Sequence, residues 1–189
     1  YNTGSLTIEY INFYSEASVS PSTSPSLQWT GAGQIDTGIT FQDVFDRNGT
    51  GEFTMAAKFQ YYGTDGQSYS AILGSHEGHG GFFVGKNSGN TALGFQDSNY
   101  EANFIASPGV FDSVGRNSSH TVVVTRSGSA GSYVNRVYID GVYMNKANFT
   151  GVNLTERILI GNESDDMSST FIGKIWQAII LDKVLPSGE

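Results

Sequence analysis

The C-terminal third of the sequence constrains the fold most, because its residues repeat with the period of β-strands and not with that of a helix. The segment 136–139 alternates between polar and apolar side chains, as a strand with one buried face does. Asp140 and Gly141 follow it, and this pair favours a two-residue hairpin turn because both residues tolerate a positive φ. Apolar-rich segments of strand length come next, at 157–161 and 171–181. The chain is therefore predicted to form antiparallel β-structure.

Short apolar segments separated by turn signals continue through the rest of the chain. In the segment 52–61, Phe53, Met55, Ala57 and Phe59 share one face of the predicted strand. Further strands are predicted at 6–14, 27–29, 34–38, 69–74, 82–85, 91–95, 103–106 and 120–126, with one short helical turn at 41–45. About twelve or thirteen short strands, with a turn signal every ~8–12 residues, are typical of a two-sheet sandwich or a barrel.

The composition is uniform along the chain, with no internal repeat of fixed period, so we expect a single domain over residues 1–189. Residues 1–26 are expected to form its N-terminal strand and a loop rich in Ser and Pro. Because the sequence starts and ends abruptly, we expect this domain to be part of a larger protein.

The composition also limits the partners that the chain can bind. Charged residues make up only 15% of it, against about a quarter in a typical domain, so Ser, Thr, Asn, Gln and Tyr must cover much of the surface. Such surfaces are common on secreted proteins, virions and sugar-binding proteins. The net charge is −8 and the ten Lys and Arg residues are scattered along the sequence, so neither nucleic acid nor an anionic membrane is an expected partner. There is no Cys, and no apolar run approaches the ~20 residues that span a bilayer, so we expect neither disulfides nor membrane insertion.

An ordered series of segments resembles the strands of a known family. The segments are Gln34–Gly38, Glu52–Phe59, Ala71–Ser75, Ser119–Arg126, Val137–Gly141, Leu159–Gly161, Phe171–Ile175 and Leu185–Glu189. Over residues 27–189 they resemble the laminin-G-like, concanavalin A-like jelly-roll family, which includes pentraxins and many lectin and carbohydrate-binding modules. The resemblance implies an all-β fold, a two-sheet antiparallel jelly-roll sandwich of the concanavalin A-like type. The chain departs from the family at Ser119, where Trp is usual, and at Trp176, where Asp is common.

The sequence lacks the carboxylates of the enzymes that share this fold. Glycoside hydrolases of this type resemble one another in a Glu-x-Asp-x-x-Glu strand, whose carboxylates act on one sugar bond from a single strand face. No such spacing occurs here, and the pair Asp165 and Asp166 lies in a polar segment that is typical of a solvated turn. We therefore expect a protein that is not an enzyme, and a divergent glycoside hydrolase or lyase is the enzymatic alternative.

The candidate carbohydrate-binding residues combine aromatic side chains, which stack on the apolar faces of sugars, with polar side chains that bind hydroxyl groups. They are Tyr62, His76, His79, Asp97, Asn99, Tyr100 and Trp176. The loops that hold His76 and Asp97 are expected to line one pocket at the rim of the sandwich. For Trp176 two placements are open. If Ile175 and Ala178 face the core, alternation turns Trp176 outward, whereas a local bulge would put it inside.

Metal binding is implied by the resemblance and not by a ligand pattern. Many relatives hold Ca2+ at the sandwich rim, where about six to eight oxygen atoms coordinate the ion. The acidic residues of predicted loops that could supply such ligands are Asp43, Asp46, Asp65, Asp97, Asp165 and Asp166. His76 and His79 flank Glu77, and these residues are metal ligands, hydrogen-bond donors to a sugar or carboxylate, or part of an exposed loop.

Five Asn-x-Ser/Thr sequons occur, at Asn48, Asn117, Asn148, Asn153 and Asn162. They bear on the protein only if it is secreted by a eukaryotic cell or belongs to a virus that buds through one.

The leading hypothesis from the sequence is a non-catalytic, lectin-like carbohydrate-binding module of an extracellular, cell-surface or virion attachment protein, such as that of a phage. Its partner would be a glycan or glycoconjugate on a cell surface. The main alternative is a structural, protein-adhesion or oligomerisation domain, in which Trp176 is buried against a neighbouring domain or a second copy of the chain. A divergent polysaccharide-cleaving enzyme is the third hypothesis.

Overall fold

The computed structural model describes residues 10–12, 27–30, 33–45, 51–62, 69–75, 81–87, 90–96, 102–104, 118–129, 132–147, 155–162 and 170–185. Its elements are β1 (Tyr10–Asn12), β2 (Leu27–Thr30), β3 (Ile35–Thr40), α1 (Phe41–Phe45), β4 (Phe53–Tyr61), β5 (Tyr69–Ser75), β6 (Gly81–Asn87), β7 (Asn90–Gln96), β8 (Ala102–Phe104), β9 (Ser119–Ser127), β10 (Val134–Ile139), β11 (Val142–Ala147), β12 (Arg157–Ile160) and β13 (Ile172–Leu181). In this part of the chain the predicted strands and the single helical turn at 41–45 are confirmed. No helix of the described residues is long and apolar enough to cross a membrane.

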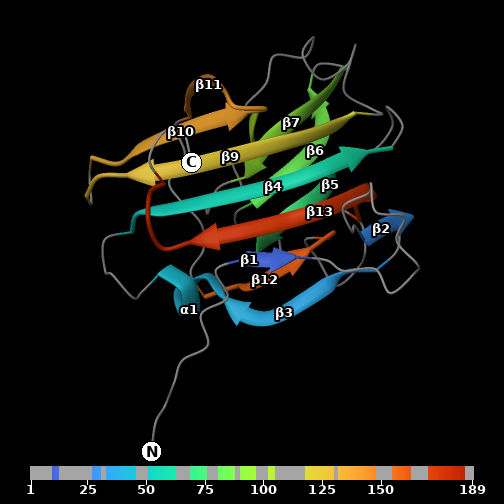
Figure 1. The fold of residues 1–189 in the computed structure, drawn as a ribbon, viewed down its shortest axis with the longest axis horizontal. Coiled ribbons are helices and arrows are strands. Elements are labelled where there is room, and N and C mark those ends of the chain that lie inside the picture. Colours follow the sequence, from blue (N-terminus) through green and yellow to red (C-terminus); the bar gives the residue numbers. More distant parts are fainter. Residues whose placement is uncertain are drawn as a thin grey trace, which may run out of the picture.

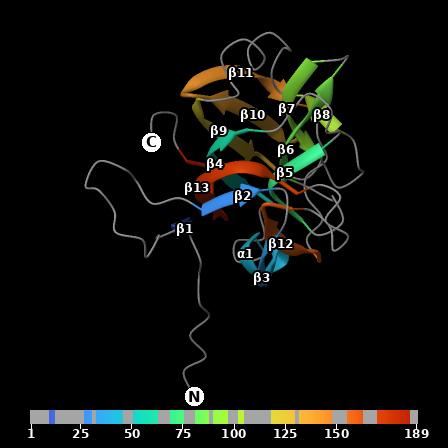
Figure 2. The same ribbon diagram turned by 90° about the vertical axis from the view of Figure 1, so that its right-hand side faces the viewer.

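The strands form two antiparallel sheets that pack face to face (Figures 1 and 2). Sheet A has the order β1-β13-β4-β9-β10-β11, and β2 also pairs with β13. Sheet B has the order β3-β12-β5-β6-β7-β8. Every strand pair is antiparallel. The predicted all-β jelly-roll sandwich is confirmed. The three C-terminal segments do not lie side by side, since β12 joins sheet B while β10, β11 and β13 join sheet A.

The core lies between the two sheets. From β4, the side chains of Phe53, Met55, Ala57 and Phe59 are each at most 2% exposed, which confirms the face predicted from alternation. They meet apolar side chains of sheet B, among them Ile72, Leu73, Leu93, Ile158 and Ile160. Burial of one such large apolar side chain stabilises a fold by about 1.5–3 kcal/mol. This core fixes which side chains of β4 and β13 must face away from sheet B.

The hairpin between β10 and β11 turns at Asp140 and Gly141, as predicted. Both residues have positive φ, 51° and 78°, and Ile139 pairs with Val142 across the turn. The Asp140 carboxylate accepts a hydrogen bond of 2.8 Å from the backbone N–H of Thr121, and its second oxygen lies 2.8 Å from His120 Nδ1. The turn is therefore tied to β9, and its carboxylate is engaged within the hairpin region.

Candidate functional site

Trp176 is the extra residue of a β-bulge in the middle of β13. Ile175 pairs with Phe59 of β4, and Gln177 pairs with the next residue, Lys58, so Trp176 has no opposite residue. Ile175 and Ala178 are buried in the core at 0% and 3% exposure, whereas Trp176 is half-buried and lies outside the core cluster. A bulge of this kind leaves two consecutive side chains on the same side of the strand. The sequence left an outward Trp176 and an inward, bulged Trp176 open; the structure has the bulge, but it sends Trp176 outward.

The pairing on the other edge of β13 is interrupted at the same residue. β2 pairs with Ile172 to Ile175, and β1 pairs with Gln177 to Ile179. Trp176 lies between the two registers and belongs to neither. Its backbone is thus irregular on both sides, a local geometry that proteins often use to re-aim a side chain at a functional site.

Polar side chains of β4 and β13 surround Trp176 on the outer face of sheet A. Lys58 pairs with Gln177, and Gln60 pairs with Lys174. All four flank residues that face the core, and Lys58, Gln60 and Lys174 are half-buried while Gln177 is exposed. We call these four residues, together with Trp176 and Tyr62, the β4–β13 outer face.

Tyr62 continues the outward side of β4 beyond the end of the strand. Its hydroxyl donates a 2.9 Å hydrogen bond to Gln60 Oε1, and its backbone N–H donates to the carbonyl of Ile172 at 2.8 Å. The structure therefore brings two of the candidate residues, Tyr62 and Trp176, to the same face.

The β4–β13 outer face combines two aromatic rings, two side-chain amides and two ammonium groups. This set can stack on an apolar patch of a ligand while donating and accepting hydrogen bonds around it. It holds no carboxylate, so it lacks the acid and the nucleophile or base that glycoside hydrolysis requires.

The other five candidate residues, His76, His79, Asp97, Asn99 and Tyr100, lie outside the described residues. The strands that flank them belong to sheet B and not to sheet A. Gly81 at the start of β6 pairs with Gln96 at the end of β7, so the strand ends that adjoin 76–80 and 97–101 in sequence lie at the same end of sheet B. The candidates therefore fall into two groups. Tyr62 and Trp176 lie on sheet A, whereas the other five adjoin strands of sheet B in sequence, and no described strand pairing connects these strands to Trp176.

Asp43, one of the acidic residues considered for calcium, caps helix α1. Its carboxylate accepts hydrogen bonds of 2.8 Å from both the backbone N–H and the hydroxyl of Thr40, and its own N–H donates to the Thr40 hydroxyl at 3.2 Å. The bonds from the Thr40 backbone and side chain lower the pKa of Asp43. This is a reciprocal capping arrangement, which the Thr-x-x-Asp spacing could have revealed.

The described residues contain no group of three or more His, Asp or Glu side chains that could hold a metal ion. The remaining acidic residues considered for calcium, and the His76–His79 pair, lie outside that part of the chain. The described residues therefore supply no ligand set for a calcium ion.

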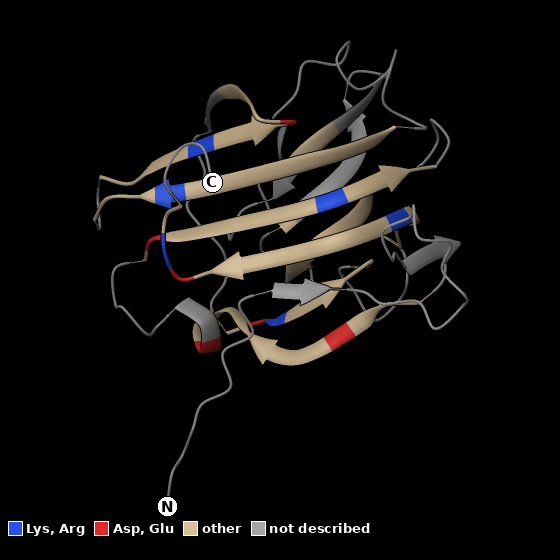
Figure 3. Ribbon diagram, viewed as in Figure 1, with Lys and Arg blue, Asp and Glu red and all other residues tan. Residues whose placement is uncertain are grey.

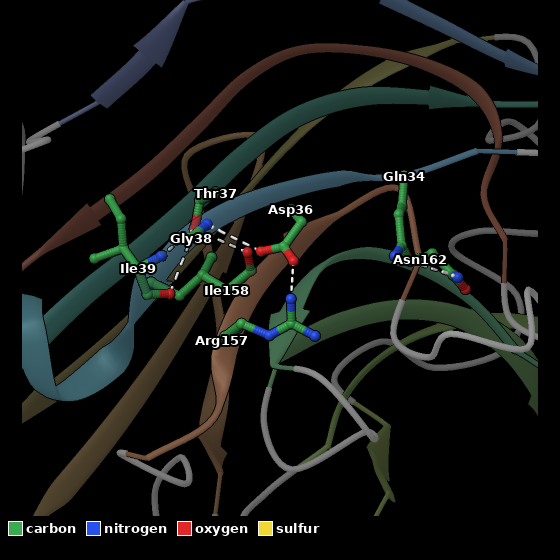
Figure 4. Close-up of polar contacts among 8 residues, drawn as sticks. All are labelled: Gln34, Asp36, Thr37, Gly38, Ile39, Arg157, Ile158 and Asn162. Atoms are coloured by element: carbon green, nitrogen blue, oxygen red, sulfur yellow. Dashed lines mark hydrogen bonds and ion pairs between the residues drawn. The ribbon is translucent and has the colours of Figure 1, made fainter.

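A second polar cluster joins β3 to β12 at the edge of sheet B (Figure 4). Asp36 forms an ion pair with Arg157 and accepts a 2.9 Å hydrogen bond from the N–H of Gly38. The Thr37 hydroxyl donates to the carbonyl of Ile158 at 2.9 Å. The ion pair and the Thr37 hydrogen bond fix β3 to β12, and the Gly38 hydrogen bond orients the Asp36 carboxylate within β3, so we assign the cluster a structural role.

Asn162 lies beside this cluster and is fully buried. Its side chain is 0% exposed, and its Nδ2 donates a 2.9 Å hydrogen bond to Gln34 Oε1 (Figure 4). A glycosyltransferase cannot reach this amide in the folded chain, so the sequon at Asn162 is not a glycosylation site of the folded protein.

Comparison with known proteins gives one family and a group of similar structures. A sequence model described as the concanavalin A-like lectin/glucanases superfamily matches residues 31–189. No curated protein matches the chain.

Three solved structures illustrate the similarity of fold. The CBM40 of the Ruminococcus gnavus IT-sialidase, bound to α2,3-sialyllactose, is 10% identical and superposes with a TM-score of 0.58 over 86% of this chain and 92% of that one. Domain 4 of AbnA, a GH43 extracellular arabinanase from Geobacillus stearothermophilus in complex with arabinotriose, is 15% identical, with a TM-score of 0.57 over 86% and 72%. A heptameric SAP-like pentraxin from Limulus polyphemus is 16% identical, with a TM-score of 0.56 over 73% and 67%. At these identities the likeness concerns the fold.

Proposed function

We propose that this chain, which belongs to the concanavalin A-like lectin/glucanases superfamily, is a non-catalytic carbohydrate-binding module. The observation that carries the proposal is the bulge that presents Trp176 on the outer face of sheet A, next to Gln177, which pairs with Lys58. An aromatic ring in this position can stack on the apolar face of a sugar ring, while the amides of Gln60 and Gln177 exchange hydrogen bonds with its hydroxyl groups.

Two of the similar structures support a glycan as the ligand. One is bound to sialyllactose and the other is in complex with arabinotriose. In this proposal the chain is a single domain, and it belongs to a larger extracellular, cell-surface or virion attachment protein. Whether binding requires Ca2+ at the rim of the sandwich is tested by running the assay with and without the ion.

The expected affinity is modest. One aromatic contact and two or three hydrogen bonds, each worth about 0.5–1.5 kcal/mol net, must outweigh the cost of association, which leaves little net binding free energy for a single site. Multivalent display is therefore the appropriate first assay, because several copies on one surface raise the apparent affinity.

The test has two steps. The chain, displayed as a multimer, is applied to a glycan array with and without Ca2+, and we expect it to retain at least one class of glycan. The glycan retained is then titrated against the wild type, Trp176→Ala and a matched control, Tyr143→Ala, which removes a 48%-exposed aromatic from another strand of sheet A. We expect Trp176→Ala to weaken binding at least tenfold and Tyr143→Ala to change it less than twofold. An array without signal in either condition, or equal binding by the wild type and Trp176→Ala, would refute the proposal.

A second candidate function, protein adhesion or self-association, is favoured by a different observation. Val142 and Tyr143 are large apolar residues with 63% and 48% exposure, and both lie on β11 at the edge of described sheet A. Tyr143 also contacts Tyr138, with ring centroids 5.5 Å apart. Light scattering tests this candidate: a stable oligomer that Tyr143→Lys dissociates would support it, and a monomer at all concentrations would exclude self-association.

A further inference from the structure

The charges of the chain are distributed unevenly between its parts. The strands of sheet A contain Lys58, Arg126, Arg136, Lys146 and Lys174, which are five of the ten Lys and Arg residues of the chain. The same strands contain none of its 18 Asp and Glu residues. In Figure 3, blue segments lie on β13, β4, β9 and β10, and no red segment lies within these strands. Basic residues that are scattered along the sequence are thus collected on one sheet of a protein whose net charge is −8.

Three of these residues face away from the core and form a diagonal across sheet A. Lys174 lies opposite Gln60, two residues along β4 from Lys58. Lys58 in turn lies opposite Thr121 of β9, while Arg136 lies opposite Thr125 of the same strand. Strand geometry therefore separates the Cα atoms of Lys174 and Lys58 by about 8 Å, and those of Lys58 and Arg136 by about 17 Å.

No acidic side chain of the described residues neutralises the two lysines. Neither Lys58 nor Lys174 forms an ion pair in that part of the chain. Two carboxylates next to strand ends of sheet A make contacts elsewhere: Asp140 with Thr121 and His120, and Glu52 with the N–H of Gly128 at 2.8 Å. Within the part of the chain that the structure describes, no carboxylate occupies the ammonium groups of Lys58 and Lys174.

We infer that the glycan bound at the β4–β13 outer face is acidic, carrying carboxylate or sulfate groups that Lys58 and Lys174 neutralise. This inference rests on the proposed function and narrows its ligand class. Basic residues on one face of an otherwise acidic protein attract an anionic ligand to that face, whereas a neutral ligand gains nothing from them. The charge therefore favours an acidic sugar over a neutral sugar of similar shape.

The arrangement fits an acidic glycan better than a nucleic acid. Double-stranded DNA carries one charge per ~1.7 Å of its axis, and its binding proteins neutralise several phosphates at once. Here three outward basic residues are spread over a diagonal of about 25 Å, with Trp, Gln and Thr side chains between them. Sparse charge with intervening aromatic and amide groups matches a chain of sugars that carries only one acidic group per sugar or per disaccharide.

The experiment compares oligosaccharides that differ only in charge. The ligands are a hexuronate oligomer, its carboxyl-reduced neutral counterpart, an O-sulfated form of that counterpart, and a DNA duplex of similar length. Titration calorimetry is run with the wild type, with Lys58→Gln/Lys174→Gln, and with Lys86→Gln, a control that removes one positive charge from β6 of sheet B. Circular dichroism confirms that each variant is folded.

We expect the wild type to bind at least one acidic oligosaccharide about tenfold more tightly than the neutral one; the carboxylated and sulfated arms show which anion is preferred. Each ammonium–anion contact near the surface contributes about a 1.4-fold to fivefold gain, so the double variant should lose most of the difference and Lys86→Gln should keep it. The preference should also shrink between about 0.05 and 0.5 M NaCl, as the Debye length falls from ~14 to ~4 Å.

The outcomes separate this inference from the proposed function. Equal binding of acidic and neutral oligosaccharides, or an unchanged preference in the double variant, overturns the inference while Trp176-dependent sugar binding still stands. Binding of the DNA duplex at least as tight as that of the oligosaccharides also overturns it. If no oligosaccharide binds and the array of the previous section is silent, both proposals fail.

Discussion

Replacing Trp176 by Ala should remove a binding residue and leave the fold nearly intact, whereas replacing Phe59 by Ala should damage the core. The two residues are close neighbours, because Phe59 pairs with Ile175, which precedes Trp176. They differ in which side of sheet A they face. Phe59 is fully buried and packs edge-on against Phe171, with ring centroids 6.2 Å apart, while Trp176 is half-buried and outside the core cluster.

The structure gives different magnitudes for the two substitutions. Phe→Ala in a well-packed core costs about 3–5 kcal/mol, which combines the lost burial with the cavity that remains. A half-buried side chain outside the core leaves no enclosed cavity, so we expect Trp176→Ala to cost only the burial of its ring, about 1–3 kcal/mol. For a chain of this size, 1 kcal/mol lowers Tm by about 2–4 °C, so the expected shifts are ~2–12 °C for Trp176→Ala and ~6–20 °C for Phe59→Ala.

Thermal and urea unfolding monitored by circular dichroism measure both effects without relying on the fluorescence of the residue that is removed. Similar m values for the two variants and the wild type would show that the substitutions change stability and not the surface exposed on unfolding. A loss in Trp176→Ala as large as that in Phe59→Ala would refute the outward placement, because only a side chain within the core leaves an enclosed cavity when it is truncated.

Two further predictions concern stability. Gly173 has a φ of +155°, and a Cβ at this position would overlap the carbonyl oxygen of Gln60, so Gly173→Ala should cost about 3 kcal/mol or more in urea unfolding. Gly33→Ala, where φ is +97° but no atom lies within 4 Å, should cost only the backbone strain of about 1–2 kcal/mol, and equal losses would contradict the steric argument. Because the hydrogen bonds from Thr40 lower the pKa of Asp43 in the folded state, they contribute stability that is present above pH ~4 and lost as the pH falls through the folded pKa. Asp43→Asn should therefore destabilise the chain slightly at pH 7 and less at pH 3; a loss that is the same at both pH values would be evidence against the capping role.

Much of the fold follows from local periodicity. The alternation of residues 52–61 predicts which side chains of β4 face the core, and the buried Phe53 and Phe59 confirm it. The Asp140-Gly141 turn is predicted because few residues adopt positive φ, and both do so here. Local patterns do not give the partner of a strand, since alternation looks the same beside any neighbour. That β13 lies next to β4 depends on contacts between residues more than a hundred positions apart.

The candidate site was predictable only in part for the same reason. Trp176 stands out as an unexplained aromatic residue, and Lys58 and Gln60 could have been added from the outward side of their strand. Their neighbours Lys174 and Gln177 become part of the site only through the pairing of β4 with β13. The spacing of three between Ile175 and Ala178, both buried, is the sign of a bulge, but the side to which Trp176 turns depends on the register of the neighbouring strands.

The most direct test of the central claim, that the β4–β13 outer face binds the ligand, is NMR mapping of a bound glycan on the 20.3 kDa chain. The glycan that gives the strongest array signal is titrated into labelled protein while the backbone amide and Trp indole resonances are followed. The account predicts that the shifts concentrate at Lys58–Gln60, at Lys174–Gln177 and at the indole N–H of Trp176. Shifts confined to residues 76–80 and 97–101, with β4 and β13 unchanged, would contradict it and place the site on sheet B.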